Sequence, residues 1–175
     1  MNTFDNWVPN KLDEFTRVTG NIGCFVNFEE RKYVASVGAY SLNSQMQLAY
    51  QHYQRVDDLI AVPVMKLTSA GIGTWASCGG HLRCGAYLAF TSVTLEFKAQ
   101  MDHSRYWHKD NVSSHCSYKY VWNLDKPNPY DTDSMINWLS GIQELYEITR
   151  DLKNDFTEMK MYLSTEHDRV IEERK

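Results

Sequence analysis

The last third of this 175-residue chain carries an apolar repeat that is typical of a long amphipathic helix. Spacings of four and three residues alternate along it, and its members are Trp138, Ile142, Leu145, Thr149, Leu152, Phe156, Met159 and Leu163. The repeat predicts a helix over about residues 133 to 172, which would be about 60 Å long at 1.5 Å per residue. Because a domain of this size has a radius of gyration of about 16 Å, the far end would either fray or pair with a second helix, most simply from another copy.

Charge is distributed unevenly along the chain. The whole sequence has 22 acidic and 18 basic residues, a net charge of −4. Nine acidic and six basic residues fall between Gln143 and Lys175, so this segment carries most of the net negative charge. Mild acidity argues against a broad basic surface for duplex DNA, although it permits a local basic pocket. An apolar content of 43% excludes wholesale disorder.

The sequence contains no apolar run of the length needed to cross a bilayer, so we expect no membrane partner. Residues 1–7 lack the basic and apolar regions of a secretory signal. We therefore expect a cytoplasmic protein whose four cysteines stay reduced.

Short apolar runs separated by turn residues predict the strands of a sheet. Ile22–Ala39 is expected to form a hairpin, because the charged tetrad Glu29-Glu30-Arg31-Lys32 divides it. Further strands are expected within Ile72–Ala76 and Ala86–Phe97, with Tyr118–Trp122 as an additional candidate. Apolar residues at helical spacing predict a helix over about residues 42 to 70, which Pro63 would kink.

These elements predict an α+β fold with a mixed or antiparallel sheet. The kinked helix and the long C-terminal helix would cover that sheet. Residues 1–132 would form the core domain, and residues 133–175 would form the long helix, which packs on the core and can protrude from it.

The most specific local feature is the turn Ser77-Cys78-Gly79-Gly80-His81, which directly follows an expected strand. A glycine turn at a strand end presents backbone amides that can hold an anion. The thiol of Cys78 and the imidazole of His81 are three residues apart, so they are the candidate catalytic pair. The simpler alternative is that Cys78 closes the strand as a small buried residue.

Zinc is the alternative that we favour less. Cys78, His81 and Cys84 are spaced as Cys-x2-His-x2-Cys, but this is not the spacing of a standard knuckle or finger. We therefore assign no metal ligands, and the cofactor stays open.

A second candidate region runs from residue 103 to residue 122, where aromatic residues alternate with cationic ones. Aromatic rings stack on bases, and cations neutralise phosphates, so this composition suits a nucleotide or a single-stranded nucleic acid. The alternative is an aromatic-rich meander that covers the sheet. The predicted ligand-binding residues of the two regions are Ser77, Gly79, Gly80, Arg83, His103, Arg105, Trp107, His108 and Lys109.

The order of elements around the turn resembles that of small phage and bacterial proteins. The resemblance is carried by a helix ending at Gly71, then Thr74-Trp75-Ala76-Ser77-Cys78, then Gly79-Gly80-His81 and Tyr87-Leu88-Ala89-Phe90. The turn is also similar to that of the tRNA wybutosine-synthesis methyltransferase family, in which arginine stands where this chain has His81. The resemblance implies an α+β fold and a phage setting, with the host cytoplasm as the location.

Two function classes follow. The first is a phage-type accessory protein, anti-defence or host-modulating, that binds a host protein or nucleoprotein. The alternative is a nucleotide- or RNA-directed enzyme centred on the Ser77–His81 turn. A homodimer through the C-terminal helix is a further prediction.

Overall fold

The computed structural model describes residues 22–37, 50–78, 86–110, 118–122 and 132–159. Within these ranges two four-stranded sheets combine with three helices, so the predicted α+β class is confirmed. In chain order the elements are β1 (Ile22–Asn27), β2 (Lys32–Val37), β3 (Gln54–Asp57), α3 (Asp58–Ser69), β4 (Thr74–Cys78), β5 (Ala86–Phe90), α4 (Leu95–Asp102), β6 (Trp107–Lys109), β7 (Tyr118–Trp122), α5 (Thr132–Thr149) and β8 (Thr157–Met159).

The first sheet has the strand order β3-β1-β2-β8 and is mixed, because β8 runs parallel to β2. The predicted hairpin is confirmed as β1 and β2, with Asn27 paired to Lys32. At the turn the side-chain carbonyl of Asn27 accepts hydrogen bonds from the backbone N–H groups of Glu29 (3.1 Å) and Glu30 (2.9 Å). Arg31 completes the reversal in the left-handed region, at φ 56°.

The second sheet has the order β4-β5-β7-β6, and its neighbouring strands are all antiparallel. The strands expected around Ala86 and at Tyr118–Trp122 are present as β5 and β7. The second strand expected within Ala86–Phe97, at Val93–Phe97, is wrong, because α4 begins at Leu95. The hydroxyl of Thr94 accepts a hydrogen bond from the Phe97 N–H at 3.2 Å, which satisfies a helix-terminal donor.

The helix predicted over residues 42–70 is wrong for residues 50–57. Residues 42–49 lie outside the described residues, and Gln54–Asp57 forms strand β3 against β1. Pairing with β1 satisfies the backbone groups that a helix would otherwise satisfy internally. The helix α3 begins only at Asp58 and contains Pro63.

The long C-terminal helix is also wrong, because α5 ends at Thr149. The Thr149 hydroxyl donates a hydrogen bond to the Leu145 carbonyl at 2.9 Å, and the following residues form a turn. Phe156, 6% exposed, then packs edge-on against Phe28 with ring centres 6.0 Å apart. The repeat therefore continues into core contacts and strand β8. Residues 160–175, including Leu163, lie outside the described residues, and the predicted homodimer loses the protruding helix on which it was based.

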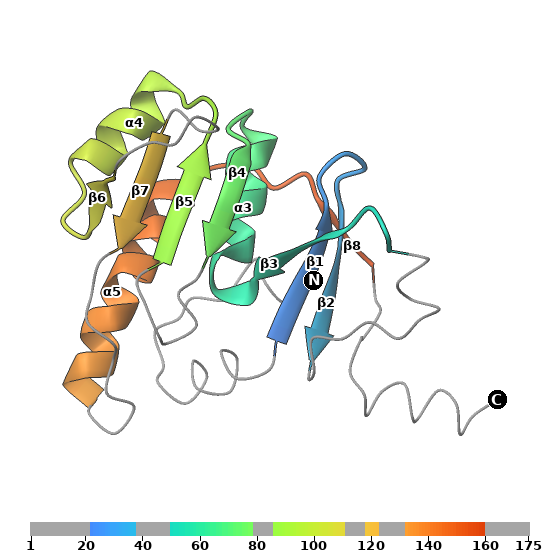
Figure 1. Cartoon of the computed structure of the whole chain (residues 1–175), viewed down its shortest axis with the longest axis horizontal. Helices are drawn as coiled ribbons and strands as arrows, with labels where there is room; N and C mark the ends of the chain where they lie inside the picture. Colours follow the sequence, from blue (N-terminus) through green and yellow to red (C-terminus); the bar gives the residue numbers. More distant parts are fainter. Residues whose placement is uncertain (1–21, 38–49, 79–85, 111–117, 123–131, 160–175) are drawn as a thin grey trace.

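The two sheets share a hydrophobic core. Buried residues of β1, β2 and β3 belong to the same cluster as buried residues of β5, β7 and all three helices. In Figure 1, α3 and α5 lie behind the sheets, and the two helices contact each other. None of the helices in the described ranges has the length and apolar character that a membrane span requires.

We expect Phe156→Ala to lower the free energy of unfolding by about 3–5 kcal/mol, since it empties a buried aromatic site between Phe28 and Arg31. Urea denaturation followed by circular dichroism measures this loss. The control is Lys153→Ala, an exposed position in the same segment, for which we expect a change within about 0.5 kcal/mol. Equal effects of the two substitutions would contradict the packing of residues 150–159 described above.

Candidate ligand-binding face of the second sheet

Side chains along the second sheet alternate between two faces, as a strand requires. Ala86, Leu88 and Phe90 of β5 are buried in the core, whereas Tyr87 between them is half-buried. The Phe90 ring packs against Phe97 of α4, with ring centres 5.3 Å apart, which identifies the inward face. The opposite face is called the outer face below.

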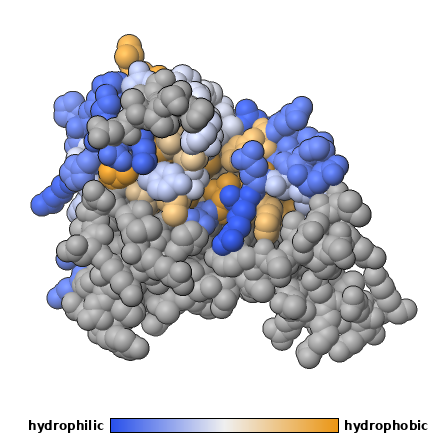
Figure 2. All heavy atoms as spheres, viewed as in Figure 1, coloured by the Kyte–Doolittle hydropathy of each residue, from blue (hydrophilic) through white to orange (hydrophobic). Residues whose placement is uncertain are grey.

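Strand register defines the residues of the outer face. Cys78, Tyr87, Val121 and His108 are paired in one row across all four strands. Two residues further along the strands, Lys119 is paired with Ala89 and therefore lies on the same face. Figure 2 shows hydrophilic and pale residues beside smaller apolar areas on the side of the sheets turned away from α3 and α5.

Tyr87 and Lys119 form the centre of this face. The Lys119 ammonium lies 5.3 Å from the centre of the Tyr87 ring, within the range of a cation–π contact. The same ammonium is 3.2 Å from a carboxylate oxygen of Asp110. His108 is exposed on the edge strand β6 and lies in the same row as Tyr87. The outer face therefore combines an aromatic ring with cationic and titratable side chains.

Trp75 lies at the margin of the sheet. It is 55% exposed, and it falls at an irregularity of the pairing between Thr74 and Ala76 on edge strand β4. Only two large hydrophobic residues in the described ranges are exposed, and Trp75 is one of them. An exposed indole at a strand irregularity supplies a second aromatic surface near the strand end that precedes the glycine turn.

The structure describes only the beginning of the predicted Ser77–His81 site. Ser77 and Cys78 are the last residues of β4, and both are half-buried. Register places Cys78 on the outer face with Tyr87, and Ser77 on the inward face with Leu88. The rest of the site lies outside the described residues, namely Gly79, Gly80, His81, Arg83 and Cys84. Within the ranges that are described, no three His, Cys, Asp or Glu side chains are grouped so as to hold a metal ion.

The second predicted region is divided between structural and surface roles. Trp107 is 2% exposed, and its indole N–H donates a hydrogen bond to the Gly141 carbonyl at 2.8 Å. Its ring is therefore part of the core and is not a platform for a base. Arg105 is exposed, and its backbone N–H donates to a carboxylate oxygen of Glu144 at 3.2 Å.

The remaining predicted residues of that region separate in space. His103 ends α4, with its Nδ1 2.7 Å from the Ala99 carbonyl oxygen. Lys109 is paired with Tyr120, so it belongs to the inward side, and its ammonium lies 5.8 Å from the Tyr118 ring centre. Of the predicted residues between 103 and 109, the register places His108 on the outer face with Tyr87.

Comparison with protein-family models, with curated proteins and with solved structures finds no match. The resemblance to phage proteins and to the wybutosine-synthesis family therefore stays a prediction.

Tyr87 and Lys119 were not among the predicted site residues. The signal that could have found them is strand alternation: in Ala-Tyr-Leu-Ala-Phe and Tyr-Lys-Tyr-Val-Trp, the second residue faces away from the apolar first and third. Composition alone grouped all aromatic and cationic residues of a segment together, although neighbours on a strand point to opposite sides.

A Glu144 carboxylate on α5 fixes the turn that leads into β6. Its oxygens accept hydrogen bonds from the Ser104 hydroxyl and the Arg105 N–H. The Ser104 oxygen in turn accepts from the N–H groups of Tyr106 (3.1 Å) and Trp107 (2.8 Å). This network holds β6, and so His108, in a defined position at the edge of the sheet.

On the inward side, a tyrosine and a carboxylate are coupled. The Tyr120 hydroxyl donates a hydrogen bond to Asp102 at 3.2 Å, and Lys98 forms an ion pair with the same carboxyl group. The hydrogen bond from Lys98 lowers the pKa of Asp102. Burial, followed by the Asp102 charge, raises the pKa of Tyr120 to about 12.

Because the Tyr120 pKa is raised by folding, its contribution to stability is complete below the ordinary pKa of 10.0 and is lost as the pH rises through about 12. We expect the stability difference between the wild type and Tyr120→Phe to be constant up to about pH 10 and then to shrink. Denaturant unfolding at a series of pH values measures it. Tyr50 and Tyr53 also have raised pKa values, but they are present in both proteins, so their effects cancel in the difference. A stability difference that stays constant up to pH 12 would refute the raised pKa of Tyr120.

Proposed function

We propose that this protein is a small cytoplasmic binding protein that holds single-stranded nucleic acid, free or within a nucleoprotein, on the outer face of its second sheet. The observation that carries the proposal is the pair at the centre of that face. The Tyr87 ring and the Lys119 ammonium lie together on the side of the sheet away from α4 and α5.

This pair offers the two interactions that a single strand requires. An aromatic ring stacks on a base of any sequence, and an adjacent cation neutralises a phosphate. Strand β5 is hydrogen-bonded on both sides, to β4 and β7, so the backbone that carries the ring is held in place before binding and little conformational freedom is lost on association. His108 lies in the same row as Tyr87, and Trp75 lies at the margin of the sheet, so both extend the surface.

Recognition of this kind fits the mildly acidic chain. A single strand can bind along a narrow surface that carries one aromatic ring and one cation, whereas a duplex needs a wide basic surface. Binding without turnover is also the mode expected of a phage accessory or anti-defence protein that occupies a host nucleoprotein. That setting is supported by the sequence resemblance.

The test is fluorescence anisotropy with a labelled 12-nucleotide RNA of mixed sequence. We expect Tyr87→Ala to weaken binding about 5- to 150-fold, the range that loss of one stacked base produces. Tyr87→Phe keeps the ring and is the matched control, for which we expect nearly wild-type affinity.

The electrostatic half of the proposal is tested in the same titration. Lys119→Gln should reduce the slope of log K against log salt by about 0.7, the value for one phosphate contact on a single strand. Lys153→Gln removes the same charge from an exposed position outside the sheets and should leave the slope unchanged. Absence of binding at low salt, or equal binding by Tyr87→Ala and the wild type, would overturn the proposal.

A second candidate is an enzyme that acts on the bound strand. It is favoured by the position of Cys78, whose half-buried side chain shares the outer face with Tyr87 at the end of β4. A nucleophile there would meet a ligand stacked on the sheet.

Mass spectrometry of the oligonucleotide after prolonged incubation separates the two candidates. Cleavage or a mass change that is lost in Cys78→Ala and His81→Ala supports the enzyme. We expect the binding protein instead: an unchanged oligonucleotide, and Cys78→Ala affinity equal to that of the wild type.

A further inference from the structure

Asp110 adds a carboxylate to the outer face, beside the residues that carry the proposed function. It directly follows strand β6, two residues after His108, so the alternation of a strand places it on the same side. Its backbone N–H donates a hydrogen bond to the Lys119 carbonyl at 2.8 Å, which continues the pairing of β6 with β7. A carboxylate oxygen of Asp110 lies 3.2 Å from the Lys119 ammonium, and the Asp110 side chain is 40% exposed.

The ammonium of Lys119 connects this carboxylate to the aromatic ring. It lies 5.3 Å from the centre of the Tyr87 ring and 3.2 Å from the Asp110 oxygen. The carboxylate oxygen can therefore be no further from the ring centre than these two distances together. A purine that stacks on the ring with a lateral offset spans this gap, because its Watson–Crick edge extends past the ring and a hydrogen bond adds about 2.9 Å.

The charge of this part of the outer face favours recognition of a base over attraction to the backbone. Lys119 and Asp110 have opposite charges, so together they add no net charge to the face. Proteins that bind single strands without sequence preference use a positively charged groove. A carboxylate beside the cation weakens phosphate binding, and a ligand that donates hydrogen bonds to the carboxylate recovers the loss.

Guanine is the common base whose edge matches a carboxylate. Its N1–H and N2–H groups are adjacent donors that point the same way, so the two oxygens of a carboxylate can accept them together. Adenine and cytosine each have an acceptor beside their amino group, and uracil has its N3–H between two carbonyl oxygens. An ammonium carries three N–H groups, so Lys119 can keep its contact with Asp110 while it binds a phosphate.

We infer that the outer face prefers single strands that contain guanine, and that Asp110 determines this preference. The guanine stacks on Tyr87 and donates hydrogen bonds from N1 and N2 to the Asp110 carboxylate. Lys119 holds that carboxylate in place and contacts the adjacent phosphate. The inference deepens the proposed function and rests on it: single-strand binding requires the ring and the cation, whereas the base preference also requires the carboxylate.

The probes are two labelled 12-nucleotide RNAs, one of uridine only and one with a single guanosine at its centre, titrated in fluorescence anisotropy. We expect the wild type to bind the guanosine strand about 5- to 150-fold more tightly, the range of one bidentate base contact. Asp110→Asn should weaken binding of the guanosine strand, because an amide cannot accept both donors. The same substitution should strengthen binding of the uridine strand, because it removes a negative charge. A general loss of folding would weaken both.

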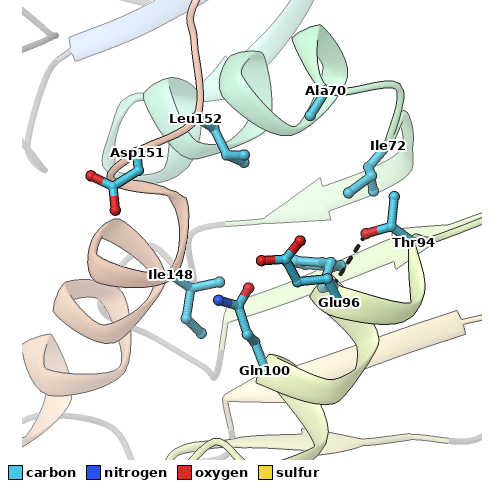
Figure 3. Close-up of a pocket in the computed structure, with 9 residues that line it drawn as sticks. Ala70, Ile72, Thr94, Glu96, Gln100, Ile148, Asp151 and Leu152 are labelled. Atoms are coloured by element: carbon cyan, nitrogen blue, oxygen red, sulfur yellow. Dashed lines mark hydrogen bonds between the residues drawn. The ribbon is translucent and has the colours of Figure 1, made fainter.

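The helix side of the second sheet provides a matched control for the protein. A pocket of about 480 Å³ lies there between α3, α4 and α5, and its lining includes Glu96 and Ile148 (Figure 3). Phe97 in the same lining packs against the inward-facing Phe90, so this pocket is on the opposite side of the sheet from Tyr87. Glu96→Gln therefore removes an exposed carboxylate far from the outer face, and it should leave the affinities for both strands unchanged.

Modified strands provide the control for the ligand. A central inosine keeps N1–H and lacks the N2 amino group, so it should lose much of the preference. A central adenosine keeps a purine for stacking and lacks the paired donors, so it should bind more weakly than guanosine. Changes of the same sign for both strands in Asp110→Asn, or inosine or adenosine strands that bind as tightly as the guanosine strand, would overturn this inference and leave the proposed function standing. Failure of both original strands to bind the wild type would overturn the two together.

Discussion

The rest of the structure depends on the burial of one face of the second sheet, because side chains along a strand alternate between its two faces. Once Leu88 and Phe90 are buried beneath α4 and α5, register fixes the direction of every side chain on the neighbouring strands. Tyr120 must then lie inward, where its hydroxyl needs the Asp102 carboxylate. Tyr87 and Lys119 must lie on the outer face. The candidate binding face is thus a direct consequence of how the core is filled.

The same burial links the elements that position this face. The α5 helix holds the edge strand β6 through the Trp107 indole and the Glu144 carboxylate. Residues after α5 return to the first sheet, where the Phe156 ring lies under the Arg31 guanidinium at 5.1 Å. The single core that joins the two sheets gives the outer face a rigid support.

Much of the fold could be predicted from local pattern. The first hairpin and β5 were predicted correctly, because charged turn residues and compact apolar runs specify them. The end of α5 at Thr149 could not be predicted. Phe156 fits both a heptad position of a longer helix and a buried contact after a turn, and residue spacing does not distinguish the two. For the site, composition selected Trp107, which is buried, and missed Tyr87, because pairing between distant strands decides which aromatic faces outward. His81 and Arg83 stay predictions.

The proposed function requires that a single strand bind across the outer face of the second sheet. Amide chemical-shift mapping of the full chain with a 12-nucleotide single-stranded RNA tests it most directly. We expect the largest shifts in β4, β5 and β7, centred on Tyr87 and Lys119, and small shifts around Glu96 and Ile148 on the helix side. Shifts confined to the helix side, or none at saturating RNA, would contradict it.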